Sequence, residues 1–289
     1  MPGYSEILGK SLGGQDLVSY ANFPPGYLPD PRKFTLIIGG THGDERATVP
    51  ILENFIAVYL ESERVKTPVV VIPVLNPDGY AGDSRYNGRG VDLNRNLPYK
   101  WSVDSDEPPG SAPLSEPETQ ALYDFILARR PAKIVSLHWA LAEIDADGAQ
   151  SIALAKHVWG ALTAAEKRPY RLRLNEGIAE EACWGSLGQW CGYGLVYPDG
   201  FRPAMITLEL PYDDGSRPRP EVLPADHFRA VRKLWMYQPQ AYLTGVTSGA
   251  QGLLEAACEW EHSGEADADP VTEAGQAQIT AGRRRPVRE

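Results

Sequence analysis

The sequence predicts a single α/β domain followed by a polar C-terminal tail. Three neighbouring segments indicate this fold class. The apolar run FTLIIGG, residues 34–40, is typical of a buried strand that ends in glycines. Apolar residues at helical spacing follow at 47–62, and a β-branched strand, TPVVVIPVLNP, comes next at 67–77. A strand, a helix and a second strand in this order imply a parallel crossover.

The other predicted elements follow in chain order. Residues 4–22 resemble short strands joined by a Gly-Gly turn. The segment 80–113 is long, polar and rich in Gly and Pro, which is typical of a functional or disordered loop. Ser115 and Glu118 are predicted to form a capping box at the start of a helix. The remaining elements are a strand at 133–138, a helix at 151–165, a strand at 204–211 and a helix at 225–242.

The C-terminal part of the sequence sets the expected domain boundary. From about Gly245 onward the chain turns small and polar, and its last residues are basic. Such a composition buries too little apolar surface to order a chain. We therefore expect a catalytic domain at 1–245 and a flexible tail at 246–289.

Composition limits the classes of partner. The chain has 289 residues and a formal net charge of −10, which disfavours a nucleic-acid-binding protein. Its three cysteines form no close CxxC pair, so free thiols in a reducing compartment are expected. We find no signal peptide and no apolar stretch long enough for a membrane helix. We expect a cytoplasmic protein with no nucleic-acid or membrane partner, and a homodimer remains open.

Residues that commonly bind metals follow two of the predicted strands. His42 and Glu45 lie in the turn GTHGDE after the strand at 34–40, and His138 ends the strand at 133–138. Ligands bind at the carboxyl ends of strands in open α/β sheets, and a catalytic zinc ion takes about three protein ligands. Together the three residues indicate a metal site. For each feature alone, a solvated polar turn is the alternative.

Charged residues elsewhere suit hydrolysis at such a site. Glu209 interrupts the apolar strand ITLELP, where a carboxylate is costly unless it is paired or belongs to a site. It is the candidate general base, and a buried acid held by an arginine is the alternative. The long loop offers Arg85, Arg89 and Arg95 to stabilise an oxyanion or bind a carboxylate. Plain solvent exposure is the alternative for each arginine.

Six segments occur in a characteristic order: GTHGDE, VLNPDGY, RYNGRGVDLNRNLP, SEPETQA, VSLH and TLELP. The ordered set resembles the zinc carboxypeptidases of the carboxypeptidase A type, from about residue 8 to Glu209. The resemblance implies a mixed, largely parallel sheet flanked by helices. It also implies that His42, Glu45 and His138 bind one zinc ion per chain, that Glu209 is the general base and acid, and that Arg85 polarises the scissile carbonyl.

Further roles follow from the same resemblance. Asn94 and Arg95 match the pair that holds the terminal carboxylate of the substrate. Asp78 is expected to support His42 or to shape the loop. The digestive members also bind substrate through a tyrosine. Tyr193 and Tyr197 are possible counterparts in this chain, and neither aligns clearly with that tyrosine.

The substrate expected from the resemblance is a small peptide with a free carboxylate. Several segments look most like the bacterial members that cleave the γ-D-glutamyl–meso-diaminopimelate bond of peptidoglycan tripeptide. The segment WALAEID after His138 departs from that pattern and leaves the pocket wall open. A pocket for the zwitterionic end of diaminopimelate needs an acid and a hydrogen-bond donor. Four residues lie in suitable segments: Asp145, Asp147, Asp199 and Arg202. For each of them, an ordinary surface position is the alternative.

Three other functions remain compatible with the sequence. The chain resembles, less closely, the N-acyl amino acid deacylases of the aspartoacylase and succinylglutamate desuccinylase type, which share the metal motif. A carboxypeptidase acting on other peptides is the second alternative. The third is a non-catalytic protein that binds muropeptide or zinc, against which the complete set of expected catalytic residues argues.

Overall fold

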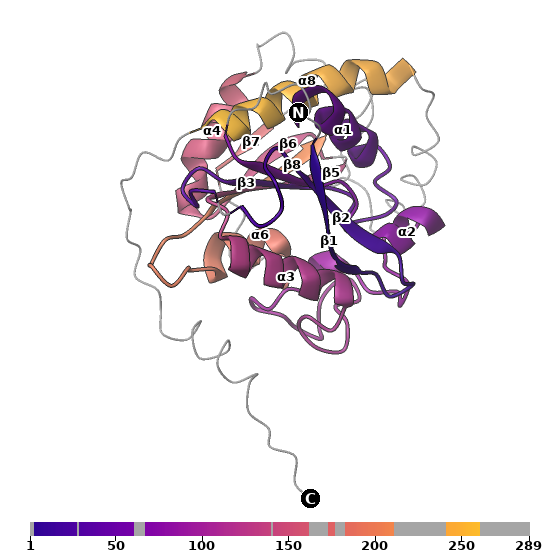
Figure 1. Ribbon diagram of the computed structural model, residues 1–289. Helices are drawn as coiled ribbons and strands as arrows, with labels where there is room; N and C mark the ends of the chain where they lie inside the picture. The colour runs from indigo at the N-terminus through magenta and orange to yellow at the C-terminus, as the bar shows by residue number, and fades with distance from the viewer. Residues whose placement is uncertain are drawn as a thin grey trace, which may run out of the picture.

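A mixed eight-stranded sheet runs through the part of the chain that the structure describes (Figure 1). The structure is a computed structural model, and it describes residues 3–27, 29–60, 67–139, 141–161, 173–176, 183–210 and 241–260. The strand order is β1-β2-β4-β3-β5-β8-β6-β7. The strands are β1 (Tyr4–Lys10), β2 (Asp16–Ala21), β3 (Thr35–Ile38), β4 (Val69–Ile72), β5 (Lys133–Trp139), β6 (Glu143–Asp147), β7 (Arg173–Asn175) and β8 (Ala204–Leu210).

The centre of the sheet is parallel, and it joins the flanking strands through antiparallel pairs. Strands β4, β3, β5 and β8 run parallel to one another, whereas β2 pairs with β4, and β6 with β8, in the antiparallel sense. The edge strand β7 pairs in parallel with β6. All residues of β3, β4 and β5 are buried, as expected for parallel strands covered on both faces. The prediction of a mixed, largely parallel α/β sheet is therefore confirmed.

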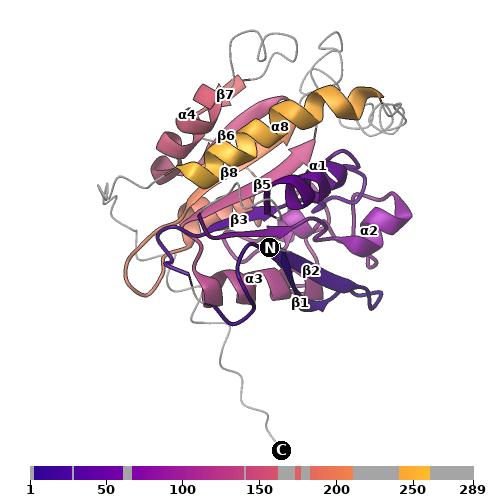
Figure 2. The ribbon, with the colours of Figure 1, turned by 45° about the horizontal axis from the view of Figure 1, so that its top comes forward.

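Helices cover both faces of this sheet (Figures 1 and 2). One core lies between the sheet and helices α1, α4 and α8, and the other includes residues of α3 and α6. The α-helices are α1 (Thr48–Phe55), α2 (Pro77–Gly82), α3 (Pro117–Arg129), α4 (Ile152–Ala161), α6 (Leu187–Gln189) and α8 (Ala241–Glu259). Two π-helical segments, η1 (Ile56–Leu60) and η4 (Trp190–Gly194), and two 3-10 turns, η2 (Leu93–Arg95) and η3 (Ala149–Ser151), complete the described elements.

Helix α3 begins differently from the prediction. Its N-cap is Glu116, which makes no side-chain cap hydrogen bond. Ser115 Oγ instead donates to Glu116 Oε1 at 2.8 Å, and Glu118 Oε1 accepts from the backbone N–H of Leu12 at 3.0 Å. The predicted capping box between Ser115 and Glu118 is therefore wrong, because the Ser115 hydroxyl binds the neighbouring Glu116 and the Glu118 carboxylate binds Leu12 of the N-terminal hairpin.

Helix α8 crosses the domain boundary expected at residue 245. Leu253, Leu254 and Ala257 of this helix are buried in the core beside α1 and α4. The buried Lys133 Nζ donates to the carbonyl oxygens of Cys258, at 2.6 Å, and Trp260, at 2.7 Å. Residues up to Trp260 are thus anchored to the domain. The proposed flexible tail beyond them, and the predicted helix at 225–242 except for its last two residues, lie outside the described residues.

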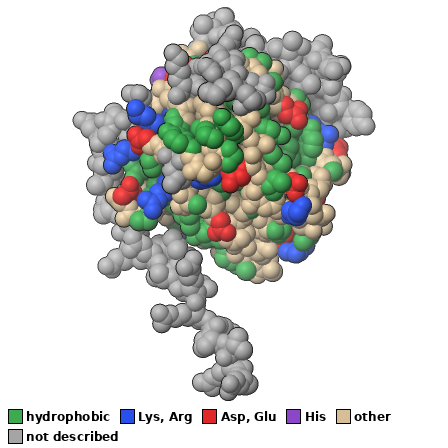
Figure 3. All heavy atoms as spheres, viewed as in Figure 1, with side chains coloured by type: hydrophobic (Ala, Val, Ile, Leu, Met, Phe, Trp, Pro, Cys, Tyr) green, Lys and Arg blue, Asp and Glu red, His purple; other side chains and the backbone are tan. Residues whose placement is uncertain are grey.

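Two further features are the distribution of charge on the surface and the apolar character of the helices. On the face in Figure 3, described basic side chains are interspersed with acidic ones rather than gathered in one band. Among the described residues, none of the helices combines the length and apolar character that a membrane span requires.

Candidate active site

The candidate active site lies at the carboxyl ends of the central parallel strands. His42 and Glu45 occupy the turn after β3, and His138 is the last residue but one of β5. Glu209 of β8 lies directly opposite His138 in the parallel register, so both side chains point to the same face of the sheet. The structure therefore brings together the four residues that the sequence nominated for metal binding and proton transfer.

The turn that holds His42 is fixed by close packing against α2. A Cβ atom added at Gly43 would lie 2.0 Å from the carbonyl carbon of Gly79, so only glycine fits there. Asn76 caps α2 by accepting from the N–H of Gly79 at 2.8 Å, and its Nδ2 lies 3.4 Å from the carbonyl oxygen of Thr41. The glycine of GTHGDE and the asparagine of VLNPDGY thus position the histidine.

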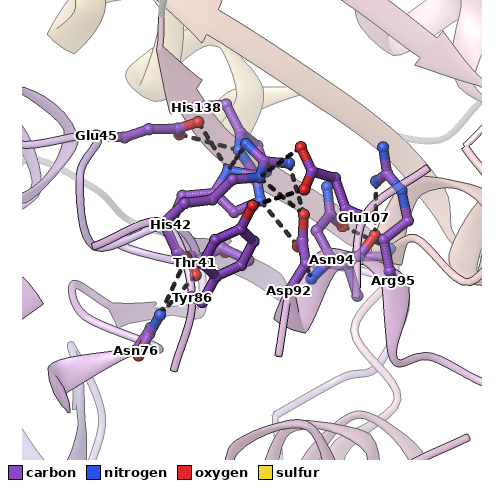
Figure 4. Close-up of polar contacts among 12 residues, drawn as sticks. Thr41, His42, Glu45, Asn76, Tyr86, Asp92, Asn94, Arg95, Glu107 and His138 are labelled. Atoms are coloured by element: carbon purple, nitrogen blue, oxygen red, sulfur yellow. Dashed lines mark hydrogen bonds and ion pairs between the residues drawn. The ribbon is translucent and has the colours of Figure 1, made fainter. Parts of the chain in front are cut away.

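His42, Glu45 and His138 form a buried cluster of potential metal ligands (Figure 4). One donor atom from each lies within 4.8 Å of the others. Glu45 Oε1 is 2.7 Å from His42 Nδ1, and Glu45 Oε2 is 3.0 Å from His138 Nδ1. Two imidazoles and one carboxylate are the donor set of many catalytic zinc sites, so the residues fit a zinc ion.

Both histidines engage their second ring nitrogen away from this centre. Asp92 Oδ1 lies 3.1 Å from His42 Nε2, and Ser136 Oγ lies 3.0 Å from His138 Nε2. The backbone N–H of Trp139 donates to Glu45 Oε2 at 3.1 Å. Such partners fix the orientation and tautomer of metal-binding histidines, which leaves the Nδ1 atoms directed at the cluster.

Asp92 also anchors Arg85. The Arg85 guanidinium contacts Asp92 Oδ2 through Nη2 at 2.6 Å and Nε at 2.9 Å. Its Nη1 lies 3.3 Å from His42 Nδ1, beside the candidate metal ligands. Arg85 therefore holds a cationic group beside the candidate metal ligands.

The electrostatics keep the carboxylates of this site ionised. Burial opposes ionisation of Glu45, but His42 and His138 outweigh it and lower the pKa of Glu45 well below its usual value. Burial likewise opposes ionisation of Asp92, and Arg85 and His42 overcome it, so the pKa of Asp92 is lowered. Two buried carboxylates held ionised around the histidines suit a bound cation.

Asn94 and Arg95 border the site on the 3-10 turn η2. Asn94 Oδ1 accepts from the N–H of Leu187 at 2.9 Å. The side chain of Arg95 is buried and forms an ion pair with the exposed Asp106. The distance from Arg95 Nε to Asp106 Oδ1 is 2.8 Å. The guanidinium of Arg95, labelled in Figure 4, thus already binds a carboxylate that its own loop supplies.

Several other sequence candidates lie elsewhere. Asp78 does not contact His42, because its carboxylate accepts hydrogen bonds from Ser11 Oγ, the N–H of Gly13 and Gln15 Nε2. Its expected support of His42 is therefore wrong, and it ties the β1–β2 turn to α2 instead. Arg89 pairs with Glu116 at 3.0 Å, outside the cluster.

The tyrosine candidates differ in position. Tyr197 is buried in the core and donates its hydroxyl to the carbonyl oxygen of Pro131 at 2.9 Å, so it cannot face the site. Tyr193 lies in η4 and is partly buried.

Comparison with known proteins agrees with this geometry. The zinc carboxypeptidase family model matches residues 6–141. Murein peptide amidase A of Escherichia coli K12 is 33% identical over 208 residues, which cover 66% of this chain and 77% of that protein. Murein peptide amidase A of Vibrio campbellii is 33% identical over 218 residues, covering 70% and 77%. The crystal structure of murein-tripeptide amidase from Escherichia coli O157 superimposes with a TM-score of 0.54 at 28% identity, covering 83% of this chain and 94% of that one.

Proposed function

Because the chain belongs to the zinc carboxypeptidase family, we propose that it hydrolyses the amide bond between γ-D-glutamate and meso-diaminopimelate in peptidoglycan-derived tripeptide. The family and the murein peptide amidase relatives make the chain a hydrolytic enzyme. The observation that carries amide hydrolysis is the buried His42–Glu45–His138 cluster, with Glu209 directly opposite His138.

We further propose that His42, Glu45 and His138 hold one zinc ion per chain. When bound, zinc supplies the Lewis acidity that polarises an amide carbonyl and makes water a nucleophile at neutral pH. The ionised Glu45 and the two Nδ1 atoms provide the charge and the donor set for this ion.

The remaining roles belong to side chains around this centre. Glu209 accepts a proton from the attacking water and delivers it to the amine that leaves. Arg85, anchored on Asp92, stabilises the negative charge on the carbonyl oxygen. Asn94 and Arg95 hold the carboxylate of the released residue, and for this the Asp106 carboxylate must give up its place on Arg95.

The substrate assignment rests on the relatives named murein peptide amidase A, which this chain matches over 77% of their length. A deacylase for N-acyl amino acids and a carboxypeptidase for ordinary peptides would use the same centre. The His-Glu-His cluster alone does not separate these three reactions, because each hydrolyses an amide next to a carboxylate.

A substrate panel tests the proposal. Zinc-loaded protein is incubated with L-Ala-γ-D-Glu-meso-diaminopimelate, with an α-linked peptide ending in an ordinary residue, and with N-acetyl-aspartate, and products are identified by mass spectrometry. We expect free diaminopimelate from the first substrate at a kcat/KM at least about tenfold above the others, the discrimination that a modest pocket provides. Faster release from the peptide or the acyl amino acid would replace the murein assignment.

A further inference from the structure

Strand β6 directs a row of carboxylates to the face of the sheet that carries the active site. Glu143 lies directly opposite Glu209, which itself lies opposite His138. One step further along the strands, Asp145 lies opposite Thr207 and Thr207 lies opposite Ser136. Residues in register point to the same face, so Asp145 lies about 7 Å from the level of Glu209, below the candidate centre.

The carboxylates of this row differ in their ion-pair and hydrogen-bond partners. Glu143 forms an ion pair with Arg173 at 2.5 Å. Asp147 accepts from Thr207 Oγ1 at 2.8 Å and packs against α6, where a Cβ atom on Gly188 would lie 2.5 Å from its Oδ1. Only 3% of Asp145 is exposed, and its Oδ1 has no hydrogen-bond partner within the described ranges.

A buried carboxylate oxygen without a donor is costly, and either a proton or a cation relieves that cost. Burial, followed by the charge of Glu143, raises the pKa of Asp145 to about 7, against hydrogen bonding from Asn175 and the charge of Arg173. The Arg173 guanidinium is therefore too weak a partner to keep Asp145 fully ionised. A second cation brought to Asp145 would restore its charge.

The register of the strands relates Asp145 to the candidate centre. Asp145 lies on the same face of the sheet as Glu209 and His138, two residues away from their level along the strands. A side chain directed from the centre along this face must therefore be several bonds long to bring a terminal charged group to Asp145.

We propose that Asp145 is a specificity residue that binds the ammonium group at the far end of the side chain of the released residue. This inference rests on the proposed function, since it assigns the pocket of the same site. The ammonium of diaminopimelate donates to Asp145 Oδ1, and Asp147 lines the wall behind it. A released residue without that amine leaves Asp145 buried and unmatched.

Paired substrates test the assignment in the wild-type enzyme. The kcat/KM of zinc-loaded protein is measured for L-Ala-γ-D-Glu-meso-diaminopimelate and for the same peptide ending in L-2-aminopimelate, which keeps both carboxylates and lacks only the distal amine. Loss of one partner of a buried charge pair costs at least about thirtyfold, so we expect the first substrate to be favoured by that factor. Equal kcat/KM values would overturn the role of Asp145.

The variant Asp145→Asn completes the cycle. We expect it to lose most of its activity on the diaminopimelate peptide and to change little on the aminopimelate peptide, so that the preference falls to about one. Asp124→Asn, which removes an exposed carboxylate on α3, should keep the wild-type preference. Equal losses of Asp145→Asn on both peptides would indicate a purely structural residue and overturn the inference. Absence of cleavage of either peptide by wild-type enzyme would instead remove the proposed function itself.

Discussion

Asp92 connects the two functional parts of the site. It lies against His42 through one oxygen and binds the Arg85 guanidinium through the other. One buried carboxylate therefore orients a candidate metal ligand and the group expected to stabilise the oxyanion. Its two partners are 50 and 7 residues away in sequence.

The variant Asp92→Asn should weaken metal binding while preserving the fold. Asparagine keeps the shape but removes the charge that balances Arg85 and orients His42. Loss of such a partner typically lowers metal affinity by about 10- to 100-fold. Zinc titration against a fluorescent chelator measures this change, with the exposed Asp124→Asn as the control. An unchanged zinc Kd would show that Asp92 does not support the metal site.

Glu209 is the residue on which proton transfer depends. Replacement by Gln keeps the size of the side chain and removes its basicity, so turnover should fall by about 10²- to 10⁴-fold. Zinc content, measured on the same preparation by atomic absorption, should remain at the wild-type value. Wild-type turnover by Glu209→Gln would exclude this residue as the base.

Local sequence was enough to nominate the metal cluster, but not its supports. His42 and Glu45 share one turn, and His138 ends a recognisable apolar strand. Asp92 stands in the motif GVDLNRN, but no local pattern marks it, because its importance depends on where a long loop returns to the sheet. For Asp78 the sequence left two roles open, support of His42 or shaping of the loop, and its partners lie in the β1–β2 turn rather than at His42.

At the scale of elements, the apolar strands were predictable and β6 was not. β3, β4 and β5 are continuous apolar runs that need burial on both faces. β6 reads EIDAD, in which acids alternate with apolar residues, and such a pattern favours exposure of the acids. The structure instead buries both Asp145 and Asp147.

This burial makes stability depend on pH. Burial, opposed by the hydrogen bond from Thr207, raises the pKa of Asp147 to about 8. The folded state therefore holds a proton that the unfolded state releases above about pH 4, so this group destabilises the fold progressively as pH rises from about 4 to about 8. Asp147→Asn mimics the protonated form and should raise stability at pH 8 by more than about 1.4 kcal/mol, the equivalent of one pKa unit.

Urea unfolding of wild type and Asp147→Asn at pH 5 and pH 8 measures the effect. The gain from the substitution should be small at pH 5 and large at pH 8. Equal gains at both pH values would mean that Asp147 is not protonated in the folded protein.

At the scale of the whole molecule, α8 closes the core from the far end of the chain (Figure 2). The sequence of this helix, AYLTGVTSGAQGLLEAACE, contains many small residues and therefore resembled the start of a polar tail. Its small side chains allow close packing on α4 and α1, which no local pattern reveals. The expected boundary at 245 was misplaced for this reason.

Truncation distinguishes the helix from the residues beyond it. A chain ending at residue 245 loses Leu253 and Leu254, each worth about 2–5 kcal/mol when buried, and should not fold cooperatively. A chain ending at Trp260 should keep the wild-type Tm within about 2 °C, if the proposed tail adds nothing to the core. Thermal unfolding followed by circular dichroism separates the two truncated chains. A cooperative transition in the shorter chain would contradict the role of α8.

We propose that hydrolysis depends on a zinc ion held by His42, Glu45 and His138. Protein stripped with a chelator is titrated with zinc, and release of diaminopimelate from the tripeptide is followed beside His138→Ala. We predict no activity without metal, a linear rise that ends at one zinc per chain, and little zinc retention in the variant. Full activity in the stripped protein, or wild-type zinc affinity in His138→Ala, would contradict this site.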